Sequence, residues 1–157
     1  MSVALYRIDD RLIHGQVVVG WGNVTGARFL VLADDGVRAS DWEQELYRMG
    51  VPAEMDVYFA SLAEAVAGLP AWEADPRAGI LLTGTVEAMA ALCAGAPAVR
   101  KVNVGGVHFR AGRSERLRYV FLTDDEAAAL RRLAAAGVAV TAQDVPTAAP
   151  VAVEDFT

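Results

Sequence analysis

A short apolar run followed by a helix-capping signal occurs three times in this chain, and this repeat restricts the fold more than any other feature. A Ser or Thr followed three residues later by Glu has the spacing of a capping box, in which the hydroxyl accepts from a first-turn amide and the carboxylate reaches back to the cap. The three pairs are Ser40 with Glu43, Ser61 with Glu64, and Thr123 with Glu126. Strands and helices are therefore expected to alternate.

Such alternation predicts an α/β fold. We expect one domain over residues 1–157, with an open, twisted, mainly parallel sheet of about seven strands and helices on both faces. A first helical stretch is expected at 15–24, later helices should end at glycines, and the tail at 146–157 should be irregular. The expected strands are 3–8, 28–33, 56–60, 79–83, 100–104, 117–122 and 138–143, and the terminating glycines are Gly50, Gly68, Gly95 and Gly137.

Composition excludes several classes of function. A formal charge of -6 disfavours nucleic acid as a partner, because a phosphate backbone would be repelled. Cys93 is the only cysteine and there are two histidines, which are too few soft ligands for a zinc site, so no metal is expected. The sequence shows no apolar run long enough to span a membrane and no export signal, which favours the cytoplasm.

The loop after the first expected strand gathers the residues best suited to chemistry. Ligands of open α/β sheets bind beyond the carboxyl ends of the strands, where amides at helix N-termini point outward. His14 is a candidate nucleophile there, and the forked guanidinium of Arg11 suits an anionic group carried on the imidazole. Either Asp9 or Asp10 could hold the imidazole tautomer, and Gly15 removes bulk beside the ring.

Residues 7–18 closely resemble the active-site segment of the IIB subunits of the mannose/sorbose family of the bacterial phosphoenolpyruvate-dependent sugar phosphotransferase system, and they read RIDDRLIHGQVV. Residues 101–106 look like the Asn-Val-Gly-Gly turn of that family, and residues 143–146 look like its closing strand end. Length and element order also match, so the resemblance spans nearly the whole chain.

The resemblance implies a phosphoryl relay. His14 would take a phosphoryl group from a phosphohistidine of a IIA protein and pass it to a sugar imported through the membrane subunits IIC and IID. This is the activity of a protein-N(pi)-phosphohistidine–sugar phosphotransferase, with the phosphoryl on the ring nitrogen nearer the main chain. No cofactor is implied beyond the phosphoryl group itself, which comes from phosphoenolpyruvate through carrier proteins. The protein would be cytoplasmic, or attached to the inner face of the membrane through IIC and IID.

Supporting roles are assigned to other residues, that of Arg11 from the same match and those of the others from their chemistry and place in the sequence. Arg11 would stabilise the phosphoryl oxygens and Asp10 would orient the imidazole, while three residues would form a phosphate-binding loop: Gly15, Gln16 and Thr83. The apolar Leu12 and Ile13 would either form part of a docking surface for partners or anchor the loop in the core. His108, after the Gly-Gly turn, is interpreted as a loop histidine rather than a second relay site.

Two alternatives stay open. One is a regulatory phosphocarrier that phosphorylates no sugar, which is favoured by departures from the family pattern near Thr83 and at Val107, where the family often has Met. The other is a nucleotide-binding module, which the absence of a GxGxxG or Walker-type loop after the first expected strand weakens. The sequence identifies neither the sugar nor the oligomeric state, and a homo-oligomer is one of the states left open.

Overall fold

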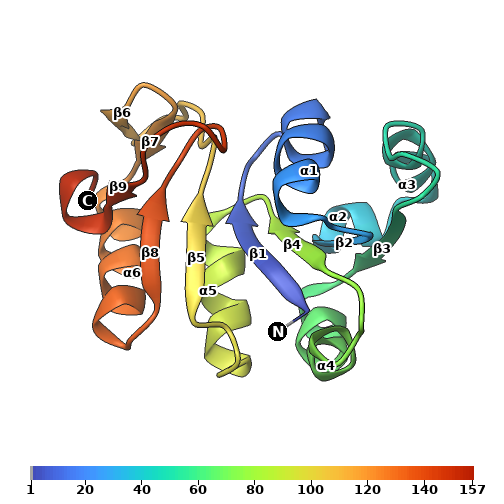
Figure 1. The fold of residues 1–157 in the computed structure, drawn as a ribbon. Coiled ribbons are helices and arrows are strands. Elements are labelled where there is room, and N and C mark those ends of the chain that lie inside the picture. Colours follow the sequence, from blue (N-terminus) through green and yellow to red (C-terminus); the bar gives the residue numbers. More distant parts are fainter. Residues whose placement is uncertain (1) are drawn as a thin grey trace.

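The computed structural model describes residues 2–157 and contains a seven-stranded sheet that is parallel except at one edge (Figure 1). Its order is β3-β2-β4-β1-β5-β8-β9, and only β9 runs antiparallel to its neighbour. This confirms the predicted α/β class and the mainly parallel sheet. The strands are β1 (Val3–Ile8), β2 (Phe29–Ala33), β3 (Asp56–Ala60), β4 (Gly79–Thr83), β5 (Lys101–Val104), β8 (Ala139–Ala142) and β9 (Val151–Ala152).

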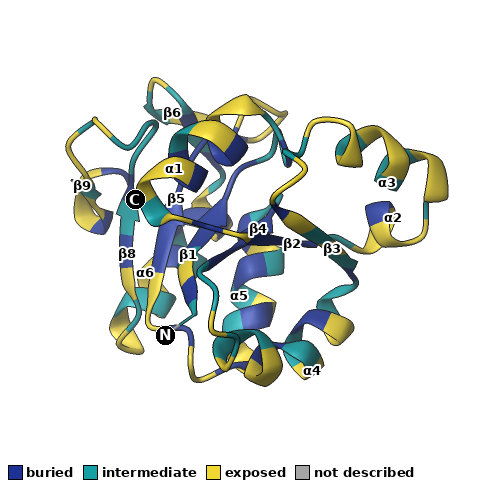
Figure 2. Cartoon of the chain, turned by 45° about the vertical axis from the view of Figure 1, so that its right-hand side comes forward, coloured by how far each residue is buried: buried dark blue, intermediate teal, exposed yellow. Residues whose placement is uncertain are grey.

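Helices cover both faces of the sheet, and each face has its own apolar core (Figures 1 and 2). On one face the buried residues of the first helical segment pack on β2 and β4, whereas the helices after β3, β4 and β7 pack on the other. The first set is the π-helical η1 (Gln16–Trp21), α1 (Gly22–Thr25), α2 (Asp35–Arg38) and the protruding α3 (Asp41–Arg48). The second set is α4 (Leu62–Glu73), α5 (Val86–Gly95) and α6 (Asp124–Ala135).

Two of the three predicted capping boxes are confirmed. The boxes at the starts of α4 and α6 have both reciprocal hydrogen bonds. Ser40 precedes α3 but its side chain caps nothing, so the third box was wrong. The backbone also differs: ψ is 100° at Ser40, compared with 167° at Ser61 and 163° at Thr123.

The prediction that helices end at glycines holds for α6 and α5. Gly137 has φ +97° and follows the end of α6, as predicted, and Gly95 is the last residue of α5. Gly68 was wrong as a helix end, because α4 continues through it to Glu73. A Cβ at Gly68 would lie 3.0 Å from the ring of Trp72, so this glycine makes room for an aromatic side chain.

The C-terminal third differs most from expectation. The single strand predicted at 117–122 is wrong: a turn at 118–119 divides it into β6 (Ser114–Leu117) and β7 (Val120–Leu122), an antiparallel pair outside the main sheet. The irregular tail predicted at 146–157 is also wrong, since it contains β9 and the 3-10 turn η2 (Val153–Asp155). Phe156 is buried in the core, which explains why this segment is ordered against β8.

The strand order places the first loop in a crevice. β1 leads to helical segments on one face, whereas β4 and β5 lead to α5 and α6 on the other, and such reversals open a cleft at the carboxyl ends of strands. Backbone hydrogen bonds fix the loop between its neighbours: the Asp9 amide donates to the Thr83 carbonyl at 2.9 Å, and the Asp10 amide to that of Gly106 at 2.9 Å. Among the described residues, none of the helices is both long and apolar enough to cross a membrane.

Candidate functional site

His14 lies at the end of the loop that joins β1 to η1. Its carbonyl accepts hydrogen bonds from the amides of Val17 and Val18 at 3.1 and 3.0 Å, so the helical turns begin here. Leu12, two residues earlier, has φ +60° and is the only non-glycine with positive φ in residues 2–157. A left-handed conformation is strained for a bulky side chain, and strain of this kind is concentrated at functional sites.

Each ring nitrogen of His14 faces an oxygen atom, and only Nδ1 is within hydrogen-bonding distance. Nδ1 lies 2.8 Å from the Leu12 carbonyl, and because a carbonyl oxygen only accepts, Nδ1 carries the proton in this arrangement. Nε2 lies 3.8 Å from Oδ2 of Asp9 and makes no hydrogen bond within residues 2–157. The side chain is 18% exposed, although Nε2 itself is buried.

The carboxylate beside the ring is Asp9, which is wholly buried between two arginines. Arg11 donates to it through Nε and Nη2, both at 3.0 Å, and Nη2 of Arg7 lies 3.2 Å away. Burial alone would raise the pKa of Asp9, but the Arg11 hydrogen bonds and the charge of Arg7 outweigh it and hold that pKa below its usual value. Asp9 is therefore a fixed negative charge next to His14.

Arg7 connects three strands from the interior. Its side chain has no exposed surface, and it donates to the Asn103 side chain, to the Gln143 carbonyl at 2.9 Å and to the Asp144 carbonyl at 3.0 Å. Its guanidinium also lies 4.9 Å from the centre of the Trp21 ring. Burial lowers the pKa of Arg7, and the charge of Asp9 opposes that effect.

The Gly-Gly turn after β5 leaves space for these arginines. A Cβ on Gly105 would lie 2.2 Å from Nη2 of Arg7, which is an impossible contact. A Cβ on Gly106 would lie 3.3 Å from both Nε of Arg11 and Oδ1 of Asp9. The turn and the first loop, which the sequence separates by about ninety residues, thus form one packed unit.

Several predicted site residues lie where we expected them. Arg11 is one-third exposed and stands beside His14 through their shared partner Asp9. Gly15 and Gln16 are exposed next to the imidazole. These residues form the accessible part of the site.

Other assignments need correction. Asp10 does not face His14: its carboxylate accepts from the His108 amide at 2.7 Å and lies 2.5 Å from Nδ1 of His108. Asp10 lies in the turn after β1, and its amide bonds the Gly106 carbonyl, which brings it beside His108. Thr83 is fully buried and its hydroxyl lies 3.4 Å from the Thr85 carbonyl, so it does not line the exposed site.

The apolar pair in the loop serves mainly as an anchor. Ile13 is buried in the same core cluster as Val17, which removes it from any docking surface. Leu12 is partly buried and packs over Gly84, where a Cβ would lie 2.7 Å from its Cδ2. The interpretation of these residues as core anchors is the one that the structure supports.

Arg7 was not identified as a site residue from the sequence, and Asp9 was named only as an alternative to Asp10 for holding the imidazole tautomer. A signal did exist, because Arg7 interrupts an otherwise apolar strand and a buried arginine needs a charged partner. Asp9, two residues further on, is that partner.

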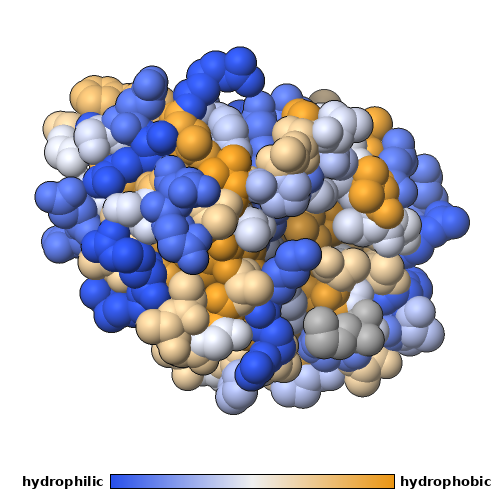
Figure 3. Space-filling model, turned by 60° about the vertical axis from the view of Figure 1, so that its left-hand side comes forward, coloured by the Kyte–Doolittle hydropathy of each residue, from blue (hydrophilic) through white to orange (hydrophobic). Residues whose placement is uncertain are grey.

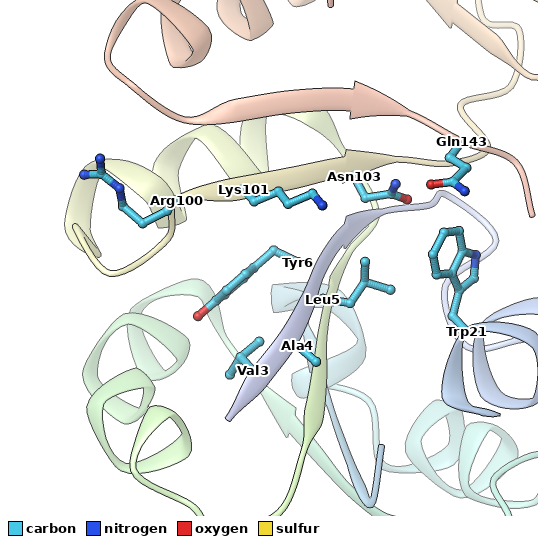
Figure 4. Close-up of a pocket in the computed structure, with 9 residues that line it drawn as sticks. All are labelled: Val3, Ala4, Leu5, Tyr6, Trp21, Arg100, Lys101, Asn103 and Gln143. Atoms are coloured by element: carbon cyan, nitrogen blue, oxygen red, sulfur yellow. The ribbon is translucent and has the colours of Figure 1, made fainter. Parts of the chain in front are cut away.

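A cavity of about 140 Å³ lies beside β1 and β5 (Figure 4). It contains no residue of the 9–15 loop, but Trp21, Asn103 and Gln143, which contact Arg7, line it. Figure 3 shows the neighbouring side of the molecule, where hydrophilic residues flank a band of apolar ones. The residues that line the cavity are Val3, Ala4, Leu5, Tyr6, Trp21, Arg100, Lys101, Asn103 and Gln143. Within residues 2–157, no three His, Cys, Asp or Glu side chains are grouped to hold a metal ion.

Known proteins resemble this chain over almost its whole length. A family model described as the PTS system sorbose subfamily IIB component matches residues 3–157. The N-acetylgalactosamine-specific phosphotransferase enzyme IIB component 1 of Escherichia coli is 35% identical over 149 residues, which cover 92% of each chain. The mannose-specific EIIAB component of E. coli is 29% identical over 94% of this chain and 46% of its own length. The crystal structure of the IIBSor domain of the Klebsiella pneumoniae sorbose permease matches with a TM-score of 0.90 at 28% identity, over 99% of this chain and 96% of that one.

Proposed function

The chain belongs to the sorbose-subfamily IIB components of the phosphotransferase system, and from that premise we propose that His14 carries the phosphoryl group between a IIA protein and a sugar. The observation that carries the proposal is the placement of one partly exposed imidazole, at the carboxyl end of β1, beside the buried Asp9 and the one-third exposed Arg11. Phosphoryl transfer requires positioning and charge stabilisation more than covalent chemistry, and this arrangement supplies both.

The bonds exchanged are nitrogen–phosphorus bonds. In the first step the bond between phosphorus and a histidine of IIA breaks as the bond between phosphorus and His14 forms. In the second step a sugar hydroxyl attacks phosphorus, and the bond to His14 breaks. The hydroxyl loses its proton in this second step. Reaction at Nδ1 requires the proton to reside on Nε2 and the Leu12 carbonyl to leave Nδ1. Asp9 favours that tautomer, since a proton on Nε2 would face its carboxylate. Asp9 thus takes the orienting role that we expected of Asp10.

Arg11 is the residue that would meet the transferred group. Its Nε and Nη2 hold Asp9, while one-third of its side chain stays exposed at the same edge as His14. The hydrogen bond with Asp9 raises the pKa of Arg11, so its positive charge is permanent. Amides at the start of η1 and the exposed Gly15 and Gln16 would complete the phosphoryl site.

Partners follow from the family. A IIB component works with a IIA protein and with IIC and IID membrane subunits, and the mannose-specific relative of E. coli carries IIA and IIB in one chain by its name. We propose the same kinds of partner here, with no cofactor other than the phosphoryl group derived from phosphoenolpyruvate.

The test is phosphorylation with phosphoenolpyruvate, the general phosphotransferase proteins and a IIA protein of the same family. We expect an acid-labile label on His14 that is lost in His14→Ala and retained in His108→Ala. Labelling of His14→Ala equal to that of the parent would overturn the assignment. Adding membranes with IIC and IID then separates sugar transport from the regulatory alternative, because only the former yields sugar phosphate.

A further inference from the structure

The exposed apolar residues of α3 lie on one face of the helix. Trp42, Leu46 and Met49 are 70%, 56% and 83% exposed. Their spacing of four and three residues places them on a single stripe, with Met49 at the C-terminal cap. We name these three residues the α3 stripe. Isolated exposed apolar residues are ordinary, whereas a contiguous stripe on one helix marks an interaction surface.

The rest of α3 is held firmly to the protein, so the stripe is not a result of loose packing. Gln44 donates to the Val37 carbonyl at 3.1 Å, and Tyr47 packs against the core of the same sheet face. The guanidinium of Arg48 lies 5.2 Å from the ring centre of Phe59 on β3. None of the residues of α3 is buried, and the helix protrudes at the β3 edge of the sheet (Figures 1 and 2).

The charges around the stripe are mainly negative. At about 100° per residue, Glu43 and Glu45 lie on either side of the stripe, and Asp41 stands in the first turn. The whole chain carries a formal charge of -6. An anionic lipid surface would repel such a patch, whereas a protein surface rich in Lys and Arg would complement it.

The stripe belongs to a segment that starts beside the phosphoryl site. Asp34 follows the last residue of β2 and caps α2, and α3 is the next helix. A Cβ on Gly84 would contact both Leu12 of the active loop, at 2.7 Å, and Asp34, at 3.8 Å. In Figure 1, α3 stands at the end of the sheet to which the strand arrowheads point, as the active loop does. A partner seated on α3 therefore lies at the edge of the molecule that carries His14.

We infer that the α3 stripe docks on a Lys- and Arg-rich cytoplasmic loop of the membrane subunits IIC and IID. This inference rests on the proposed function. Cytoplasmic loops of membrane proteins carry an excess of Lys and Arg, so their charge complements the acidic flanks of the stripe. The apolar side chains would supply the buried centre of the interface, and Glu43 and Glu45 its charged rim.

The experiment measures binding of the unphosphorylated protein to inside-out vesicles that contain IIC and IID subunits of the same family. Combined Trp42→Ser, Leu46→Ser and Met49→Ser replacement should weaken binding about 30-fold, as for loss of a hot spot. The matched control replaces the equally exposed Val24 and Phe109 by Ser, and it should bind as the parent does. Because no phosphoryl group is involved, binding succeeds or fails independently of the role of His14.

A second variant tests the charge argument. Glu43→Lys with Glu45→Lys keeps the stripe and should also weaken vesicle binding, and added salt should reduce the difference from the parent. Both variants should unfold at the parent's temperature, since neither changes a buried side chain.

Four results would overturn the inference. The first two are parent-like vesicle binding by the stripe variant, and equal binding of the parent to anionic vesicles that lack IIC and IID. The third is slower phosphorylation of the stripe variant by IIA, which would assign the stripe to IIA. The fourth is a dimer of the parent that the stripe replacements dissociate, which would assign the stripe to a second copy of the chain.

Discussion

Replacement of Gly105 by Ala tests whether the buried arginine cluster is as tight as the structure indicates. The new Cβ would lie 2.2 Å from Nη2 of Arg7 and 2.4 Å from its Cζ. Gly105 has no positive φ, so the effect would be steric and not conformational. Restoring an ordinary contact of about 3.5 Å requires the guanidinium to retreat by roughly 1.3 Å.

That retreat costs hydrogen bonds as well as packing. Arg7 donates to the Gln143 and Asp144 carbonyls at 2.9 and 3.0 Å, and a shift of this size breaks or stretches both. Hydrogen bonds to charged groups contribute about 1.5–3 kcal/mol each, and overpacking costs about 1–3 kcal/mol. With partial relaxation we expect Gly105→Ala to lower the free energy of unfolding by about 3–5 kcal/mol, a large part of the usual total.

The adjacent glycine provides the matched control. A Cβ on Gly106 would lie 3.3 Å from Nε of Arg11, whose side chain is one-third exposed and can move. Gly106→Ala should therefore cost less than about 1 kcal/mol. Urea unfolding of both variants measures the difference. Equal stability of the two variants, or a Gly105→Ala protein within about 1 kcal/mol of the parent, would refute the steric argument.

Three further outcomes follow from the same site. Asp9→Asn should slow phosphorylation of His14 about 100-fold, whereas Asp10→Asn should slow it less than about fivefold, as measured with labelled phosphoenolpyruvate; equal effects would contradict the assignment of Asp9. Although burial would raise them, hydrogen bonds from neighbouring arginines hold the pKa values of Asp9 and Glu126 below their usual range. Both carboxylates thus stabilise the fold above about pH 4 and lose this effect as pH falls further, so acid unfolding should be less steep in Asp9→Asn. His108→Gln should leave the label on His14 intact, and mass spectrometry of the labelled peptide checks this.

The strands were predictable because their ends carry local signals. β1, β3 and β4 begin and end where the sequence predicted, since polar or glycine residues mark the ends of each apolar run. β9 was not predictable in the same way, because a two-residue strand exists only through its pairing with β8. The hairpin of β6 and β7 was missed for a related reason: Leu117 and Val120 read as one apolar run, and only tertiary packing separates them.

The sequence predicted which ionisable residues gather in the first loop, and it did not predict the contacts that support them. His14 and Arg11 stand out as ionisable residues in a loop after a buried strand. Which of two adjacent carboxylates faces the imidazole depends on the conformation of the turn after β1, which the residue types alone do not specify. The Gly-Gly turn was matched to a family pattern, but its contact with Arg7 arises from strand order and cannot be read from local sequence.

Three charged side chains of the first motif meet in the structure. Arg7 lies on β1, whereas Asp9 and Arg11 lie in the turn that follows it, and both guanidinium groups bond the one carboxylate, so two positive charges share one negative charge. The cluster therefore keeps one net positive charge beside His14 in a chain of formal charge -6. A phosphoryl group of charge near −2 gains from that local excess, whereas Asp9 keeps the buried Arg7 from standing unpaired. Loss of Asp9 should thus affect both the orientation of the imidazole and the folding of the loop, which is why its effect must be compared with that of Asp10 at equal stability.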